Sequence, residues 1–122
     1  MELALLTAFI IKHFVIDYCL QTSYMIQNKG TYGAWGGLWH SLQHGIGSGI
    51  IYLTIGILPA IIAFIFDYIA HYHIDYVKSN LWKHYNFEKT DRGFWIVHGI
   101  DQLLHYLTYV AIFVIVSHYY AI

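Results

Sequence analysis

Charged side chains are scarce in this 122-residue chain. Aspartate, glutamate, lysine and arginine make up 11% of it, while apolar residues make up 58%. A soluble domain ordinarily carries about 25% charged residues. There is too little charge to cover a soluble surface, so the excess apolar surface is expected to face lipid. A soluble four-helix bundle is the alternative, but runs such as residues 110–116, VAIFVIV, leave no polar stripe on the helix.

Cysteine and proline are also nearly absent, with one residue of each. A single cysteine, Cys19, excludes a disulfide framework and a CxxC metal site. The net charge of −1 leaves no basic field for nucleic acid, so none is expected as a partner. The N-terminal segment lacks the basic start and the small-residue cleavage site of a signal peptide, and we interpret it as a retained first helix.

Long apolar segments are what the chain does have. Four of them approach or exceed the roughly 20 residues that cross a bilayer as a helix, and none alternates as a strand does. They cover residues 2–20, 38–56, 59–78 and 94–120. We therefore predict one all-α integral-membrane domain over residues 1–122, a polytopic bundle of four transmembrane helices.

Basic residues fall in or beside the two long polar connections, residues 21–37 and 79–93. The positive-inside rule places these connections in the cytoplasm, and therefore both termini outside it. The bacterial inner membrane is the expected location and the lipid bilayer the expected partner. The sequence leaves the oligomeric state open.

A shift of 58 residues superposes HFVIDY at 13–18 on HYHIDY at 71–76, and also His40 on His98. The identities fall on polar positions inside apolar runs. Two helices per unit return the chain to the same side of the membrane. The pattern thus predicts two parallel two-helix repeats, related by an axis along the membrane normal.

Histidines and aspartates lie inside all four segments, with at least one pair on each spaced four residues apart and so on one helix face. At ~1.5 Å per residue, nearly all lie in one layer about 5–10 Å below the predicted cytoplasmic edge. The expected metal ligands are His13, Asp17, His40, His44, His71, Asp75, Asp101 and His105. His98 is a further ligand or supports one, Asp67 is expected to orient His71, and Lys12 to snorkel or pair with an acid.

Such groups each cost roughly 2.5 kcal/mol or more in hydrocarbon, so they must satisfy one another. Interhelical hydrogen bonding alone is the simplest interpretation. Haem ligation and a proton or ion path are others. Imidazoles and carboxylates without thiolates favour a divalent metal, one or two ions of zinc, manganese or iron. Two ions bridged by a carboxylate would suit the large number of ligands.

Four motifs carry a resemblance to a known family: HFVIDYCLQ, HSLQH, HYHIDYVK and DQLLH. In this order they resemble the family catalogued as domain of unknown function 3307, small integral-membrane proteins of bacteria and phages. The resemblance spans nearly the whole chain and adds Gln21, Lys78 and Gln102 to the site. His98 and Asp67 lie outside the family pattern. A looser similarity is to membrane-bound metal-dependent hydrolases.

We therefore predict a membrane-embedded, metal-dependent hydrolase acting on a lipid or lipid-linked phosphate reached from the cytoplasmic leaflet. Divalent ions would activate water and hold the phosphoester oxygens. The expected catalytic residues are Asp75, Asp101, Gln21, Gln102 and Lys78. Two alternatives remain open. One is a non-enzymatic membrane protein with a structural metal or a hydrogen-bonded core that binds another membrane protein. The other is a di-iron or haem redox protein.

Overall fold

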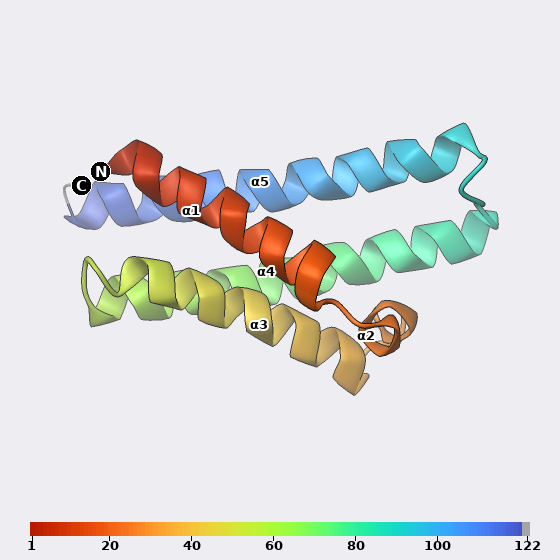
Figure 1. Ribbon diagram of the computed structural model, residues 1–122, viewed down its shortest axis with the longest axis horizontal. Coiled ribbons are helices and arrows are strands. Elements are labelled where there is room, and N and C mark those ends of the chain that lie inside the picture. Colours follow the sequence, from red (N-terminus) through yellow and green to blue (C-terminus); the bar gives the residue numbers. More distant parts are fainter. Residues whose placement is uncertain (121–122) are drawn as a thin grey trace.

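The computed structural model describes residues 1–120, which form helices and contain no strand. The elements are α1 (Glu2–Phe14), η1 (Val15–Leu20), α2 (Ser23–Asn28), α3 (Trp35–Tyr52), α4 (Ile57–Tyr85) and α5 (Arg92–Tyr120). The all-α prediction is confirmed. Figure 1 shows α1, α3, α4 and α5 running in alternating directions, so α1 begins at the end of the molecule where α5 ends.

The long helices form a ring in which α1 packs on α3 and α5, and α4 packs on the same two helices from the opposite side. Helices α1 and α4 lie diagonally across this ring and share no backbone contact in the described part of the chain. Each long helix therefore turns one face towards a common interior, and that interior holds the polar residues.

Three of these helices are long and apolar enough to cross a membrane: α1 with η1, α4 and α5. Their outer faces carry large apolar side chains; Ile61, Ile65 and Ile69 of α4, for example, are 47%, 47% and 52% exposed. These findings support the membrane prediction. The fourth predicted span, α3, is less apolar because most of its buried residues are glycine, serine and histidine.

Several helix boundaries differ from those predicted. Helix α3 covers Trp35–Tyr52 rather than residues 38–56, and α4 and α5 each begin two residues earlier than predicted. Helix α4 continues to Tyr85 rather than ending at residue 78, because the polar stretch after Lys78 contains no helix breaker and Trp82 stacks on Phe94 of α5 at 4.2 Å. It ends where Asn86 adopts a left-handed conformation with φ of 50°. The short α2 was not predicted; its first turn is capped by Thr22, whose hydroxyl accepts from the Met25 amide.

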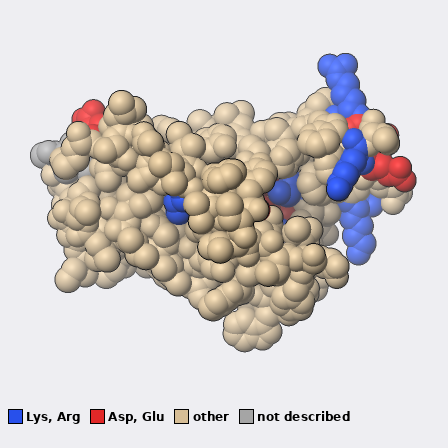
Figure 2. Space-filling model, viewed as in Figure 1, with Lys and Arg blue, Asp and Glu red and all other residues tan. Residues whose placement is uncertain are grey.

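The interior has an apolar half and a polar half. The apolar half lies at the end where α1 begins and α5 ends, and consists of Leu5, Phe9, Tyr52, Ala60, Ala63, Tyr109, Ile112 and Val116. Exposed charged side chains gather at the opposite end, where α4 and α5 are joined, and the remaining face is almost free of charge (Figure 2).

Helix α3 approaches α4 closely at Gly45. A Cβ atom there would lie 2.9 Å from the Phe64 carbonyl oxygen and 3.0 Å from Tyr68 Cβ. Backbone cannot yield as a flexible side chain can, so we expect Gly45→Ala to separate the helices and destabilise the protein by roughly 1–3 kcal/mol. Thermal unfolding in detergent measures this. Gly99→Ala on α5 is the matched control, because no atom lies within 4 Å of that position. Equal melting temperatures for both variants would contradict this packing.

Candidate metal centre

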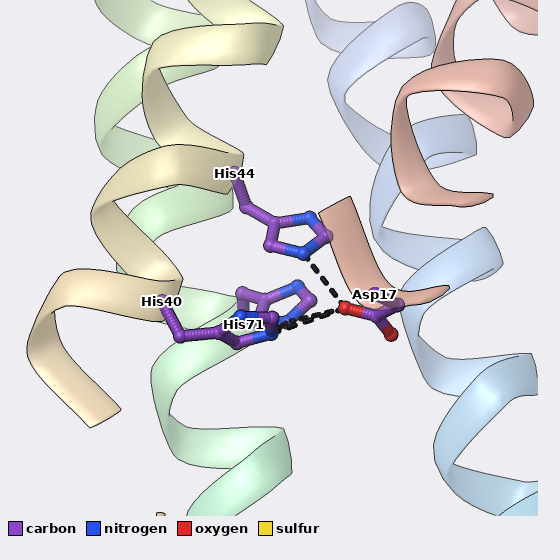
Figure 3. Close-up of side chains that lie close together, drawn as sticks. All are labelled: Asp17, His40, His44 and His71. Carbon is purple, nitrogen blue, oxygen red and sulfur yellow. Dashed lines mark hydrogen bonds and ion pairs between the residues drawn. The ribbon is translucent and has the colours of Figure 1, made fainter. Parts of the chain in front are cut away.

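Four polar side chains from three elements meet in the ring interior. Asp17 comes from η1, a π-helical turn of a kind often found at functional sites. His40 and His44 lie one turn apart on α3, and His71 comes from the middle of α4 (Figure 3). One potential ligand atom from each lies within 4.8 Å of the others, and all three histidines are fully buried. We call these four residues the Asp17 group.

The Nε2 atoms of the three histidines all approach Oδ1 of Asp17. The distances are 2.9 Å from His44, 3.0 Å from His40 and 3.9 Å from His71. The Nε2 atoms of His40 and His71 are only 3.1 Å apart. Two N–H groups cannot face each other at that distance, so at least one of these nitrogens presents a lone pair to the centre of the group.

This arrangement fits a cation. A tetrahedral ion with metal–nitrogen and metal–oxygen bonds of about 2.1 Å separates its ligand atoms by about 3.4 Å. Of the six separations among the four ligand atoms, the four given above are 2.9, 3.0, 3.1 and 3.9 Å, and they lie on both sides of that value. The Nδ1 atoms of the three histidines are buried and have no hydrogen-bond partner among the described residues. The Asp17 group thus has the donor atoms and the spacing for one divalent ion.

A second group, His71, Asp75 and His105, also places three potential ligand atoms close together. It shares His71 with the Asp17 group, and the His71 and His105 rings stack at 4.0 Å. Asp75 already has two cationic partners: Lys29 Nζ lies 2.7 Å from Oδ2 and Lys78 Nζ lies 3.5 Å from Oδ1. The second group is therefore less in need of a metal than the first.

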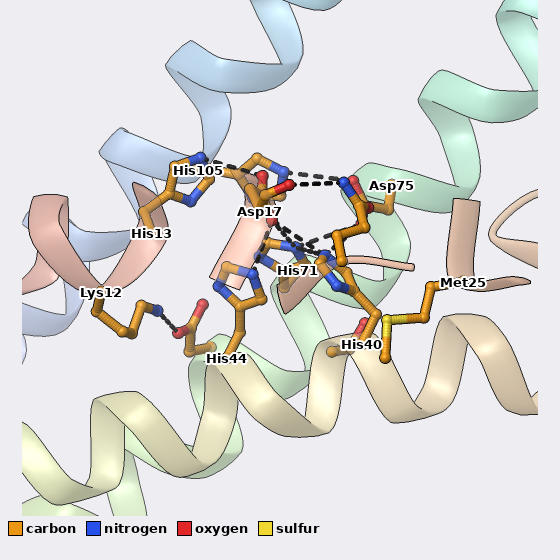
Figure 4. Close-up of polar contacts among 12 residues, drawn as sticks. Lys12, His13, Asp17, Met25, His40, His44, His71, Asp75 and His105 are labelled. Carbon is orange, nitrogen blue, oxygen red and sulfur yellow. Dashed lines mark hydrogen bonds and ion pairs between the residues drawn. The ribbon is translucent and has the colours of Figure 1, made fainter. Parts of the chain in front are cut away.

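Lysines accompany every other buried carboxylate of the interior. Asp67 pairs with Lys12 at 2.5 Å, Asp75 with Lys29, and Asp101 with Lys78 at 3.0 Å. Among the described basic side chains, only histidines lie within 4.0 Å of the Asp17 carboxylate, and Figure 4 shows them around it. A buried carboxylate requires a compensating charge, and Asp17 is the one for which the described side chains supply no fixed cation.

His13 stands outside both groups. Its Nδ1 accepts from the Tyr109 hydroxyl at 2.8 Å, and its Nε2 donates to Gln102 Oε1 at 2.9 Å. The same Nε2 lies 3.3 Å from Oδ2 of Asp17. His13 therefore contacts the Asp17 oxygen that faces away from the other histidines, which suits it to orient the carboxylate.

Lys12, Ser48 and Asp67 form a separate buried cluster beside His44. Lys12 donates to Ser48 at 3.1 Å, Ser48 donates to Asp67, and the Lys12 ammonium lies 4.4 Å from the centre of the Tyr109 ring. The prediction that Lys12 pairs with an acid is confirmed. Asp67 binds Lys12 and Ser48 rather than His71, so its predicted contact with His71 is wrong.

The Asp17 group adjoins a cavity of about 590 Å³ between η1, the α2 segment and the charged ends of α4 and α5. Asp17 is the only acid among the described residues that line it. Four of the six basic residues of the chain also line it: Lys29, Lys78, Lys83 and Lys89. The cavity therefore suits an anionic ligand, and it places that ligand beside Asp17.

Three predicted site residues besides Asp17 and Lys78 line the same cavity: Gln21, Gln102 and His98. Gln21 donates to the Asp17 carbonyl oxygen at 2.9 Å, and Gln102 donates to Asp101 at 3.0 Å. His98 is half-buried beside Trp82 and Trp95, outside both groups. Asp101 also lies outside both, between Lys78 and His105, with His105 Nε2 at 3.4 Å.

Sequence reasoning missed Lys29. It lies in a polar connection just after α2, yet its side chain is 5% exposed and reaches the buried Asp75. No periodicity marks such a residue, because it does not belong to an apolar segment. Tyr109 and Ser48 were missed for another reason: hydroxyl groups are common in membrane helices, and only the fold shows which ones contact charged residues.

The chain matches the family described as "Protein of unknown function (DUF3307)" over residues 5–121 and belongs to it. This confirms the resemblance noted from the four motifs. No curated protein and no solved structure matches the chain.

Proposed function

We propose that this DUF3307 protein is an integral-membrane enzyme that hydrolyses a lipid or lipid-linked phosphoester, with one divalent ion held by Asp17, His40, His44 and His71. One observation supports this most directly. Asp17 is the carboxylate of a three-histidine cluster, and it is also the one acid that the described residues contribute to a lysine-lined cavity. An ion at Asp17 would therefore face the place where a phosphate is attracted.

The proposal includes α3 as a fourth span and the two halves as parallel repeats. The diagonal positions of α1 and α4 are those that a central two-fold axis requires of corresponding helices. The basic loop between α4 and α5 would lie in the cytoplasm, with the start of α1 on the other side. Substrate would then reach the cavity from the inner leaflet.

When bound, a divalent ion supplies Lewis-acid activation of water and of a phosphoryl oxygen. In the hydrolysis, water adds to phosphorus, the ester P–O bond breaks, and a proton from water ends on the leaving alcohol. Lys78, Gln21 and Gln102 line the cavity and would bind the phosphate oxygens. Asp75 and Asp101, predicted as catalytic, would hold Lys29 and Lys78 in place through ion pairs of 2.7 and 3.0 Å.

The metal preferred follows from the number of ligands. Four protein ligands complete the shell of tetrahedral zinc, which is the arrangement of structural sites. Manganese(II) or iron(II), with six positions, would keep two open for water and substrate. We therefore propose manganese or iron for the enzyme. A structural zinc site in a protein that binds another membrane protein is the second candidate, favoured by the complete burial of the three histidines.

Metal content and phosphate release, measured on the same sample, test the proposal. The protein is purified in mild detergent, stripped with a chelator, and reloaded with manganese, iron(II) or zinc. We expect one ion per chain, and release of inorganic phosphate from phosphatidic acid in mixed micelles with manganese or iron. One zinc per chain without phosphate release under any metal would instead establish the structural alternative.

Two exposed basic residues provide a matched comparison for the cavity. Lys83 lines it and Arg92 does not. We expect Lys83→Gln to raise KM several-fold with kcat little changed, because an exposed charge at the mouth attracts substrate without contacting the reacting atoms. Arg92→Gln should leave both values as in the wild type. Equal effects of the two substitutions would show that the cavity is not the substrate route.

A further inference from the structure

An apolar groove of about 280 Å³ lies between α4 and α5, and almost all of its exposed lining is apolar. Six aliphatic side chains form most of it: Ile74, Val77 and Leu81 of α4, and Val97, Ile100 and Leu104 of α5. Helices α4 and α5 are both long and apolar enough to cross a membrane, so we expect the hydrocarbon of the bilayer to meet this groove.

An ion pair borders the groove, whereas the groove between two packed membrane helices is ordinarily lined by apolar side chains alone. Lys78 and Asp101 both line it, with their charged groups 3.0 Å apart. Lys78 also lines the lysine-rich cavity. A single lysine therefore borders a space suited to hydrocarbon and a space suited to an anion.

An alkyl chain that carries an anionic group matches the groove and the lysine at its border. The chain is much thinner than a helix, which with its side chains is about 10–12 Å across, so it suits a groove of about 280 Å³. A phosphate on that chain would meet Lys78 first, and Asp101 would keep two other partners if Lys78 turned away: Gln102 at 3.0 Å and His105 at 3.4 Å.

We propose that one anionic lipid occupies both spaces, with an acyl chain in the α4–α5 groove and its phosphate in the lysine-lined cavity, Lys78 lying between them. If this lipid is the substrate, the inference rests on the proposed function. The substrate class is then phospholipids with acyl chains that enter laterally from the inner leaflet. Water-soluble phosphoesters would lack the chain that the groove holds.

Photocrosslinking tests the groove directly. Phosphatidic acid with a photoreactive group on one acyl chain is added to the full-length, metal-loaded protein in micelles, and crosslinked peptides are mapped by mass spectrometry. We expect crosslinks on the groove residues of α4 and α5. Ile100→Trp should fill the groove and reduce them roughly tenfold, the loss expected if two methylene groups are displaced. Leu107→Trp is the control, since both positions on α5 are 52% exposed and only Ile100 lines the groove.

Adding inorganic phosphate tests the link between the two spaces, because it should compete with the lipid phosphate and lower crosslinking in the groove. Crosslinks spread evenly over the exposed faces of α4 and α5, or equal effects of the two tryptophan variants, would overturn the inference. If inorganic phosphate does not lower the crosslinking, the groove and the lysine-lined cavity do not hold the same lipid. The proposed function fails separately: it fails if no ion binds or no phosphate is released, whatever the crosslinks show.

Discussion

Asp17→Asn is expected to abolish metal binding at the concentrations that saturate the wild-type protein. Asparagine has the same shape, so packing changes little, but it removes the negative charge and the strongest ligand of the Asp17 group. Loss of a residue that merely supports a metal ligand typically costs roughly 10–100-fold in affinity. Loss of Asp17 itself should exceed about 100-fold. Metal titration with analysis of the bound ion, on protein stripped with a chelator, measures the change.

Two comparisons separate ligation from a general loss of structure. His13→Gln should weaken metal binding less than Asp17→Asn, because His13 contacts only the outer oxygen of Asp17, at 3.3 Å. Asp91→Asn, in the exposed loop before α5, should leave binding unchanged.

The melting temperature provides an independent test of a metal at Asp17. A chelator should lower the melting temperature of the wild type, but not that of Asp17→Asn, in which no buried charge is left without a partner. Identical chelator responses would contradict a metal at Asp17.

The convergence of the histidines and aspartates could be predicted from two features of the sequence, their polarity and their spacing. Polar residues such as His71 and Asp75 stand out inside an apolar helix, and spacing of four residues places them on one face. The cost of burying them in hydrocarbon then requires that faces from different helices meet. These arguments depend on composition and helical geometry alone, so they hold before the packing is known.

Which atoms face each other could not be predicted, because that depends on the rotation of each helix. The π-helical turn at residues 15–20 changes the direction in which Asp17 points relative to a regular helix. His13, expected as a ligand, instead meets Tyr109 and Gln102 of α5. The sequence places His13 and His71 in equivalent motifs, yet His71 lies on the side of Oδ1 of Asp17 with the other two histidines, whereas His13 contacts Oδ2. His13 and His71 thus differ in their local packing, although the repeat gives them equivalent positions in the sequence.

The partners of the lysines also could not be predicted from the sequence. Lys29 was interpreted only as a mark of membrane orientation, which is the usual role of basic residues near the ends of apolar segments, and Lys78 also as a catalytic residue. In the structure, Lys29 and Lys78 are buried and neutralise Asp75 and Asp101. This changes the expected metal content from as many as two ions to one, because the second set of potential ligands already has its cations.

Lys12→Met is expected to be the most destabilising single substitution of a residue outside the Asp17 group. Methionine preserves the apolar stem but leaves Asp67 of α4, which is fully buried, with Ser48 of α3 as its one hydrogen-bond partner among the described residues. Removing one member of a buried ion pair typically costs roughly 3–5 kcal/mol, because the other charge remains uncompensated. Unfolding in mixed micelles, followed by tryptophan fluorescence, measures the loss of free energy.

The double variant Lys12→Met/Asp67→Leu distinguishes charge from packing. Replacing a whole buried ion pair by apolar residues is often neutral or stabilising, so most of the lost stability should return. Lys83→Met, an exposed lysine on α4, is the control and should change stability by less than about 0.5 kcal/mol. If the double variant is no more stable than Lys12→Met, the cost comes from packing and not from the uncompensated charge of Asp67. Because neither residue belongs to the Asp17 group, the double variant should still bind one ion, which separates the stability of the bundle from the chemistry of its site.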